Sequence, residues 1–138
     1  MTHWSIHTNL LVLMRQKAKV LTEQELEIMK AVWETGPAKV RDVYERLRKK
    51  RQVANTTVMT MMNILVDKKH LKKKTVGRVF HYEPTRPKEK VVSAMVQDFV
   101  GRVFDGSAQP LLLHLVEDRR LSESDLKEIE QLIEEKLK

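Results

Sequence analysis

The 138-residue sequence contains no cysteine, which excludes a disulfide scaffold, a Cys-ligated zinc site and a thiol nucleophile. It also lacks long hydrophobic runs. Near the N-terminus the longest run is Leu10 to Met14, too short for a signal peptide or a membrane span. We therefore expect a cytoplasmic protein that does not insert into membranes. The hydrophobic fraction of 41% still supplies enough apolar side chains for a folded core.

The motifs of common enzyme classes are missing as well. The sequence has no Walker loop, no G-x-S-x-G, no H-E-x-x-H and no Ser/His/Asp set near a likely cleft. His3 and His7 have the i, i+4 spacing of helical metal ligands, but no third ligand lies near them in the sequence. Glutamates between residues 128 and 135 fit the solvated face of a helix. We expect no catalytic residue, no metal site and no cofactor, and hence a protein that is not an enzyme.

Positive charge is concentrated in the middle of the chain. Residues 39–90 hold 16 basic and 5 acidic residues, whereas residues 91–138 hold 6 basic and 10 acidic ones. A basic segment of this kind attracts a polyanion, most often a nucleic acid, and the acidic end remains available for protein contacts. The alternative is an ordinary solvated surface.

Two helices are predicted after a flexible tail over residues 1–20. Thr22 and Glu25 have the spacing of a capping box, and Gly36 followed by Pro37 ends the first helix. Its predicted core stripe is Leu26, Met29 and Trp33. The second helix spans about residues 40–50, and its buried stripe consists of Val40, Val43, Tyr44 and Leu47.

A third helix over about residues 54–69 has an unusual exposed face. Its core stripe is Val58, Met61, Met62 and Leu65. The opposite stripe carries no charge before Asp67, although 33% of the residues in the chain are charged. Small hydroxyls, an amide and a thioether suit close approach to base edges in the DNA major groove. We therefore predict base contacts from this stripe, with coverage by another part of the protein as the alternative: Thr56, Met59, Thr60 and Asn63.

A basic β-hairpin follows. The segments 71–76 and 79–84 are rich in β-branched and aromatic residues, and Gly77 with Arg78 supplies the turn. Three helices followed by such a hairpin predict a winged helix-turn-helix domain over residues 21–86. The residues expected to contact DNA phosphates are Arg41, Thr57, Lys68, Lys69, Lys72, Lys74 and Arg78.

The C-terminal part, residues 87–138, is predicted to form three amphipathic helices. Its apolar residues exceed what some fifty residues can bury as a monomer, so we expect a homodimer, with a self-contained three-helix bundle as the alternative. The fold class is thus mainly α with a small β-hairpin wing. The expected dimer contacts are Val92, Met95, Val96, Phe99, Val103, Leu112, Leu115, Leu126, Ile129, Leu132 and Ile133.

Several segments resemble the penicillinase-repressor (BlaI/MecI) family. They are LEIMKAVW at residues 26–33, VRDV at 40–43, TTVMTMMNIL at 56–65, the wing with Gly77, Arg78 and Tyr82, FDGS at 104–107 and LHL at 113–115. Together the resemblance covers residues 21–138.

The resemblance implies a dimeric winged-helix repressor on short inverted repeats in promoters, often of TACA/TGTA type. It further implies a link to antibiotic resistance and relief of repression when a membrane sensor metalloprotease cuts the C-terminal domain. The cut bond of the staphylococcal members aligns with His114 and Leu115, where this sequence departs from their Asn–Phe pair. Those members also carry Lys and Arg at the positions of Thr56 and Met59, so a different operator is expected. The Cys ligands of the copper-responsive branch are absent.

The alternative function is a sequence-neutral architectural DNA-binding or RNA-binding protein. RNA readers stack bases on exposed aromatic residues, but only Phe80 and Tyr82 qualify here and both are expected to pack the wing. A neutral binder would carry charge along the third helix. We therefore expect a sequence-specific transcriptional repressor of double-stranded DNA, while the sequence leaves an activator open.

Overall fold

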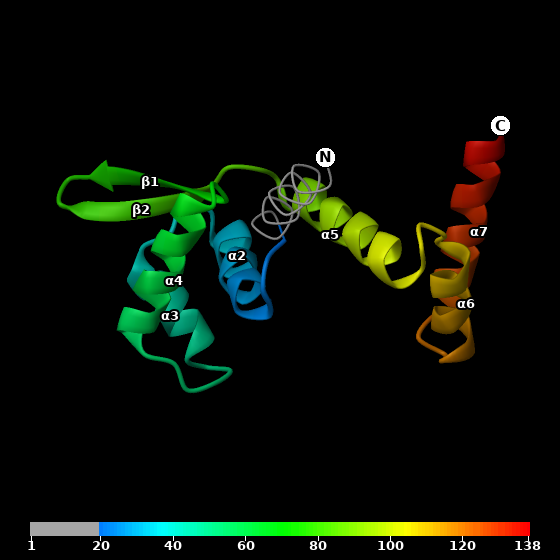
Figure 1. Cartoon of the computed structure of the whole chain (residues 1–138), viewed down its shortest axis with the longest axis horizontal. Coiled ribbons are helices and arrows are strands. Elements are labelled where there is room, and N and C mark those ends of the chain that lie inside the picture. The colour runs from blue at the N-terminus through cyan, green and yellow to red at the C-terminus, as the bar shows by residue number, and fades with distance from the viewer. Residues whose placement is uncertain (1–19) are drawn as a thin grey trace, which may run out of the picture. The chain divides into compact units, whose positions relative to one another are not determined.

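The computed structural model describes residues 20–138, so the predictions for His3, His7 and the N-terminal tail lie outside the described residues. The chain divides into two compact units, one up to Met95 and one over Val96–Lys138 (Figure 1). The elements are α2 (Glu23–Thr35), α3 (Val40–Leu47), α4 (Asn55–Asp67), β1 (Leu71–Val76), β2 (Val79–Pro84), α5 (Lys88–Val103), α6 (Gln109–Glu117) and α7 (Glu123–Leu137).

The predicted capping box begins α2. The Thr22 N–H donates to Glu25 Oε1 over 2.9 Å, and the Glu25 N–H donates to Thr22 Oγ1 over 3.2 Å. Each side chain thereby satisfies a backbone donor that the first helical turn leaves unpaired. At the other end Gly36 adopts φ 78°, a conformation that side chains with a Cβ rarely take.

The predicted core stripe of α2 was only partly right. Met29 is buried, but Leu26 and Trp33 are half-buried, and Ile28 and Val32 complete the core face instead. Trp33 stays at the edge, where its indole N–H donates to the Arg86 carbonyl over 3.3 Å. A fully central position would have denied the indole N–H this partner.

The core of the first unit gathers side chains from all its elements. The predicted stripes of α3 and α4 contribute Val43, Leu47, Val58, Met62 and Leu65, all buried. Both helices end a few residues earlier than predicted. The chain turns after Leu47, and Lys69 adopts φ 67°, which breaks the helical path before β1.

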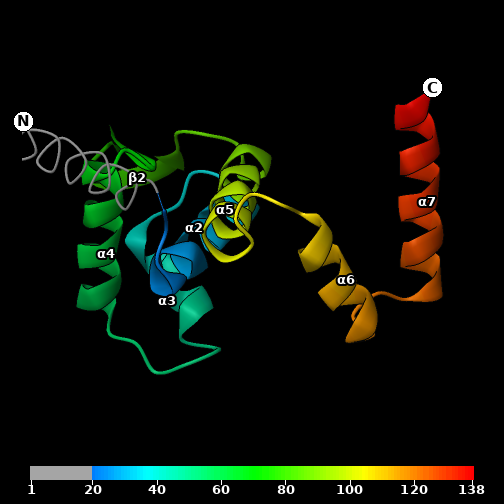
Figure 2. The same cartoon turned by 45° about the vertical axis from the view of Figure 1, so that its right-hand side comes forward.

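The wing is a two-stranded antiparallel sheet, and Figure 2 shows it at the end of α4 from which the chain enters β1. Lys73 pairs with Tyr82 and Thr75 with Phe80, while Gly77 turns the chain with φ 67°. Directly paired residues share a face of a sheet, and successive residues alternate. Lys73 therefore shares a face with Tyr82 and Phe80, and Lys72 and Lys74 lie on the other face.

Tyr82 is the point at which the wing joins the helices. Its side chain is 1% exposed, and its backbone exchanges hydrogen bonds of 3.0 and 2.8 Å with Ala38, just before α3. The wing is thus fastened to the helical core through β2, as a two-stranded ribbon requires for stability.

The segment that follows β2 is fastened to the first unit. The Thr85 hydroxyl donates to the Lys69 carbonyl over 2.7 Å, and the Arg86 carbonyl accepts from Trp33. Val91 is 5% exposed within the core, and Met95 packs against it. The boundary expected between residues 86 and 87 therefore falls inside the first unit, and the division lies after Met95.

The second unit covers few of its apolar side chains by itself. Ser122 and Asp125 cap α7 reciprocally, and the hydrogen bonds from Ser122 lower the pKa of the exposed Asp125 carboxyl. Phe104 contacts Phe99 and His114, with ring centroids 5.8 and 5.9 Å apart. No residue of Val96–Lys138 is buried in the single chain. Among residues 20–138, no helix combines the length and the apolar composition needed to cross a bilayer.

Candidate nucleic-acid interface

A hollow of about 630 Å³ lies between the start of α3, one face of α4 and the wing. Asn55, Met59 and Asn63 line it from α4, at the i, i+4, i+8 spacing of a single helical face. Four basic residues and one acidic residue, Glu45, stand around it; the basic ones are Lys39 just before α3, Arg41 in α3, and Lys73 and Arg78 from the wing. The hollow is therefore a basic concave surface beside an uncharged helix face.

Most other arginines of the basic segment are neutralised by nearby glutamates. Within the described part of the chain the ion pairs are Arg46–Glu34, Arg48–Glu45, Arg51–Glu27, Lys68–Glu25, Lys74–Glu83 and Arg102–Asp98. None of the four basic residues of the hollow takes part in one of these pairs. All four basic side chains of the hollow therefore remain available for a polyanion, as do other lysines of residues 39–90 that lie outside it.

Two residues of the predicted base-contacting stripe, Met59 and Asn63, line the hollow, whereas Thr56 and Thr60 do not. Thr56, Thr60 and Met59 are exposed, with Met59 at 44%. The Thr60 hydroxyl donates to the Thr56 carbonyl one turn earlier, over 3.0 Å. Thr57 and Arg41, both predicted phosphate ligands, are also exposed. The contacts of these residues with DNA remain a prediction.

Asn63 has a different environment from the rest of the stripe. It is half-buried, and its Oδ1 accepts hydrogen bonds from the Tyr82 hydroxyl (3.1 Å) and from Lys73 Nζ (3.3 Å). Paired recognition of adenine needs both the carbonyl and the amino group of an Asn side chain. Because the Asn63 carbonyl already has two donors, the structure ties this residue to the wing.

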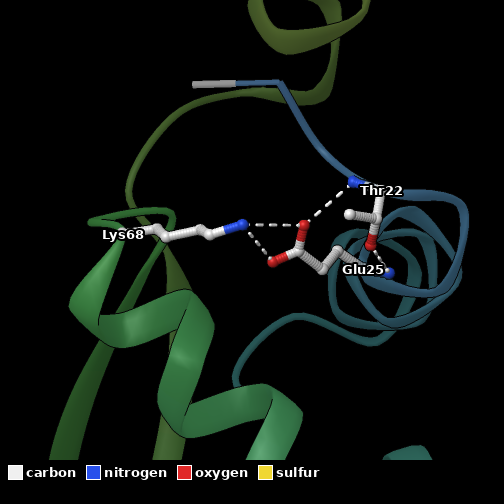
Figure 3. A network of polar contacts seen from close by, with 3 residues as sticks. All are labelled: Thr22, Glu25 and Lys68. Atoms are coloured by element: carbon white, nitrogen blue, oxygen red, sulfur yellow. Dashed lines mark hydrogen bonds and ion pairs between the residues drawn. The ribbon is translucent and has the colours of Figure 1, made fainter. Parts of the chain in front are cut away.

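Lys68, predicted to contact phosphate, is part of a buried ion pair (Figure 3). From the end of α4 its Nζ reaches Glu25 at the start of α2, with distances of 2.8 Å to Oε2 and 3.1 Å to Oε1. The Glu25 side chain is only 4% exposed. This carboxylate needs a cation to offset its desolvation, so Lys68 is occupied inside the unit and we remove it from the phosphate-contacting set.

The pKa of Glu25 reflects this environment. Burial acts to raise it, but the hydrogen bonds from Lys68 and from the Thr22 backbone, together with the Lys68 charge, outweigh burial. The net result is a pKa below the ordinary value of 4.5. Glu25 is therefore ionised at neutral pH and links α2 to the end of α4.

The phosphate ligands predicted on the wing also need revision. Lys72 and Lys74 lie on the face away from Tyr82, and Lys74 Nζ is 3.4 Å from Glu83 Oε1. Lys73, which the prediction passed over, shares the face of Tyr82 and lines the hollow, as does Arg78. The alternation from the apolar Leu71 was the sequence signal that could have selected Lys73. Lys39 was also missed, and Lys69 is exposed as expected.

The bond predicted as a cleavage site lies within α6. The carbonyls of His114 and Leu115 accept hydrogen bonds from the N–H groups of Asp118 (2.9 Å) and Arg120 (3.0 Å). A protease cuts chain that is locally opened, so cleavage here would require the end of α6 to unfold first.

Most predicted dimer contacts are exposed in the single chain. Met95 is the exception, because it packs against the core of the first unit. The remaining positions are exposed or half-exposed: Val92, Val96, Phe99, Val103, Leu112, Leu115, Leu126, Ile129, Leu132 and Ile133.

Comparison with known proteins identifies the family. Residues 21–135 match the family model described as penicillinase repressor. This chain belongs to the penicillinase repressor family. The family consists of DNA-binding transcriptional repressors rather than enzymes, as the resemblance implied.

Relatives span nearly the whole chain. The penicillinase repressor of Bacillus licheniformis is 28% identical over 120 residues, covering 87% of this chain and 94% of its own. The transcriptional regulator BlaI of Mycobacterium tuberculosis is 33% identical over 107 residues, which is 76% of this chain and 78% of that one. A solution structure of Bacillus licheniformis BlaI, monomeric and in complex with the blaP half-operator, matches with a TM-score of 0.45 and 30% identity. It covers 50% of this chain and 84% of that structure's chain.

Proposed function

We propose that this protein represses transcription by binding, as a homodimer, to a palindromic operator in double-stranded DNA. The observation that carries the proposal is the hollow, where four basic residues without carboxylate partners surround an uncharged face of α4. Basic side chains hold phosphates, whereas small neutral side chains leave room for base edges. Membership of a repressor family supports the same reading.

In the proposed complex, the exposed face of α4 enters the major groove and the hollow receives one DNA backbone. Thr56, Met59 and Thr60 meet base edges, with Met59 and the threonine methyls suited to thymine. Phosphates are held by Lys39, Arg41, Lys73 and Arg78 around the hollow, and by the exposed Thr57 and Lys69 outside its lining. If the dimer neutralises about 8 phosphates, log K should fall with log salt at a slope of about −7.

The homodimer is proposed for the second unit. Its exposed apolar side chains would be unfavourable in water, and a second copy related by a two-fold axis would bury them. The symmetry of such a dimer matches an inverted repeat in the operator.

Relief of repression by a membrane sensor metalloprotease is proposed on the family resemblance. Cutting near His114 and Leu115 would remove α7 from the remainder of the chain and weaken the dimer. Each half-site would then be bound without tethering, which lowers apparent affinity by a factor of about 10²–10⁴.

The proposal is tested by selecting fragmented genomic DNA on the purified protein at about 150 mM salt, where non-specific phosphate binding is weak. We expect a short palindrome from a few promoters. Uniform recovery of all fragments would instead favour a sequence-neutral binder, and reporter transcription from the recovered promoters separates repression from activation.

The dimer is tested with Leu132→Glu, which places a charge among apolar side chains of α7. We expect a monomer by sedimentation and a large loss of affinity for the full operator, with affinity for one half-site retained. Gln131→Glu adds the same charge at the neighbouring exposed position and should leave the dimer intact. A dimeric Leu132→Glu protein would contradict this interface.

A further inference from the structure

Lys73 stands in an unusual setting for a lysine on an exposed strand. Its Nζ lies 4.0 Å from the centroid of the Phe80 ring and 3.3 Å from Asn63 Oδ1. The Tyr82 ring centroid is 5.7 Å away on the same face of the wing. A ring face and an amide oxygen attract an ammonium without neutralising its charge.

The groups around the Lys73 ammonium, Asn63 and the rings of Phe80 and Tyr82, form a cradle that is anchored in the core through Tyr82. The Tyr82 hydroxyl donates to the same Asn63 Oδ1, and Tyr82 is 1% exposed. Asn63 is therefore fixed between α4, the wing and Lys73. A long lysine side chain normally loses rotamer freedom when it binds, and a preformed cradle reduces that loss.

We propose that Lys73 is a pre-organised phosphate ligand of the DNA complex, and that Asn63 is a positioning residue that holds it rather than a reader of bases. Its ammonium borders the hollow together with Arg78, and no carboxylate of the described residues forms an ion pair with it. This inference rests on the proposed function. It deepens that function by explaining how Asn63, Tyr82 and Phe80 hold Lys73 in place for its phosphate contact.

Lys73→Ala provides the direct test, with the selected operator and a series of salt concentrations. Each phosphate contact contributes about 0.9 to the salt slope, so the slope of a dimer should become shallower by about 1.8. Lys30→Ala removes an exposed lysine of α2 far from the wing in sequence and should leave the slope unchanged. An unchanged slope in Lys73→Ala would overturn the proposal.

Tyr82→Phe tests the positioning role, because it removes only a hydroxyl too buried to reach DNA. We expect a three- to tenfold loss of affinity that is equal for all operator sequences. In the Lys73→Ala background the same substitution should cost nothing further, since the two act through one contact. Independent losses in the double variant would show that Tyr82 does not act through Lys73.

Asn63→Ala separates positioning from base reading. Positioning predicts a uniform loss across single-base operator variants, whereas base reading predicts relaxed preference at one symmetric pair of positions. Phe80→Leu is a further variant that leaves the core untouched, because Phe80 is 49% exposed, and it should weaken binding in the same way. Wild-type protein that selects no DNA sequence would refute the proposed function. Specific wild-type binding with these variants unaffected would refute only the role of Lys73.

Discussion

Replacing Lys68 by methionine would leave the buried carboxylate of Glu25 without its cation. Two unit charges about 4 Å apart attract by about 4 kcal/mol at an effective dielectric constant of about 20. Glu25 would keep its hydrogen bond from the Thr22 backbone, and Lys68 is already 27% exposed. We therefore expect Lys68→Met to lower the free energy of unfolding by about 2–4 kcal/mol. This is somewhat less than the loss of about 3–5 kcal/mol that follows when one partner of a fully buried pair is removed.

Replacing the other partner of the pair, Glu25→Gln, should lower the free energy of unfolding by a smaller amount. The amide oxygen of glutamine can still accept from Thr22, and the freed lysine can reach water. We expect a loss of about 1–2 kcal/mol, and the double variant should be more stable than Lys68→Met alone. This asymmetry distinguishes a desolvated carboxylate from an ordinary surface pair, for which both losses would be below about 1 kcal/mol.

Urea unfolding followed by Trp33 fluorescence provides the assay, in a Trp4→Phe background so that the signal comes from α2. The measurements should be repeated at several pH values. A lowered carboxyl pKa stabilises the fold above its ordinary value of 4.5, and this stabilisation is lost as the pH falls through the folded-state pKa. The difference between wild type and Lys68→Met should therefore shrink on acidification. Equal stability at pH 7, or a gap that widens in acid, would refute the reasoning.

Three further changes have expected outcomes. A chain ending at Met95 should unfold cooperatively, whereas one ending at Pro87 lacks Val91 and should be less stable by at least about 1.5 kcal/mol in thermal melts. Gly77→Ala should cost about 1–2 kcal/mol, because φ 67° strains any residue with a Cβ; an undiminished melting temperature would contradict this. Ser122→Ala should cost about 1 kcal/mol of α7 stability, visible as faster amide exchange in its first turn.

The sequence predicted the order of the elements because each carries a strong local signal. The capping box at Thr22 and the stripe through Val58 and Met62 are determined by neighbouring residues, so they are readable without the fold. The partners of Lys68 and Asn63 cannot be read from the sequence in this way. Lys68 meets Glu25, 43 positions away, and Asn63 meets Tyr82, 19 positions away, and no local pattern indicates such contacts.

The wing shows why charge alone misleads at a site. Lys72, Lys73 and Lys74 are equivalent in composition, but strand alternation directs only the middle one to the hollow. The alternation of side chains along the strand from the apolar Leu71 could be read from the sequence, whereas the ion pair of Lys74 with Glu83 could be seen only in the structure. The contacts that group the start of α5 with the first unit were equally unreadable, since Val91 and Met95 are indistinguishable in sequence from the apolar residues that follow them in α5.

The glutamates that pair with arginines of α3 and the following turn have a consequence for selectivity. Glu27, Glu34 and Glu45 each engage one arginine that would otherwise attract any phosphate backbone. A chromosome offers about 10⁶–10⁹ competing sites, and affinity for them rises with every free cation, whatever the sequence. Acidic residues outside the base-contacting stripe would in this way determine what fraction of the molecules stays free to search. Neutralising them would strengthen DNA binding and weaken regulation at the same time.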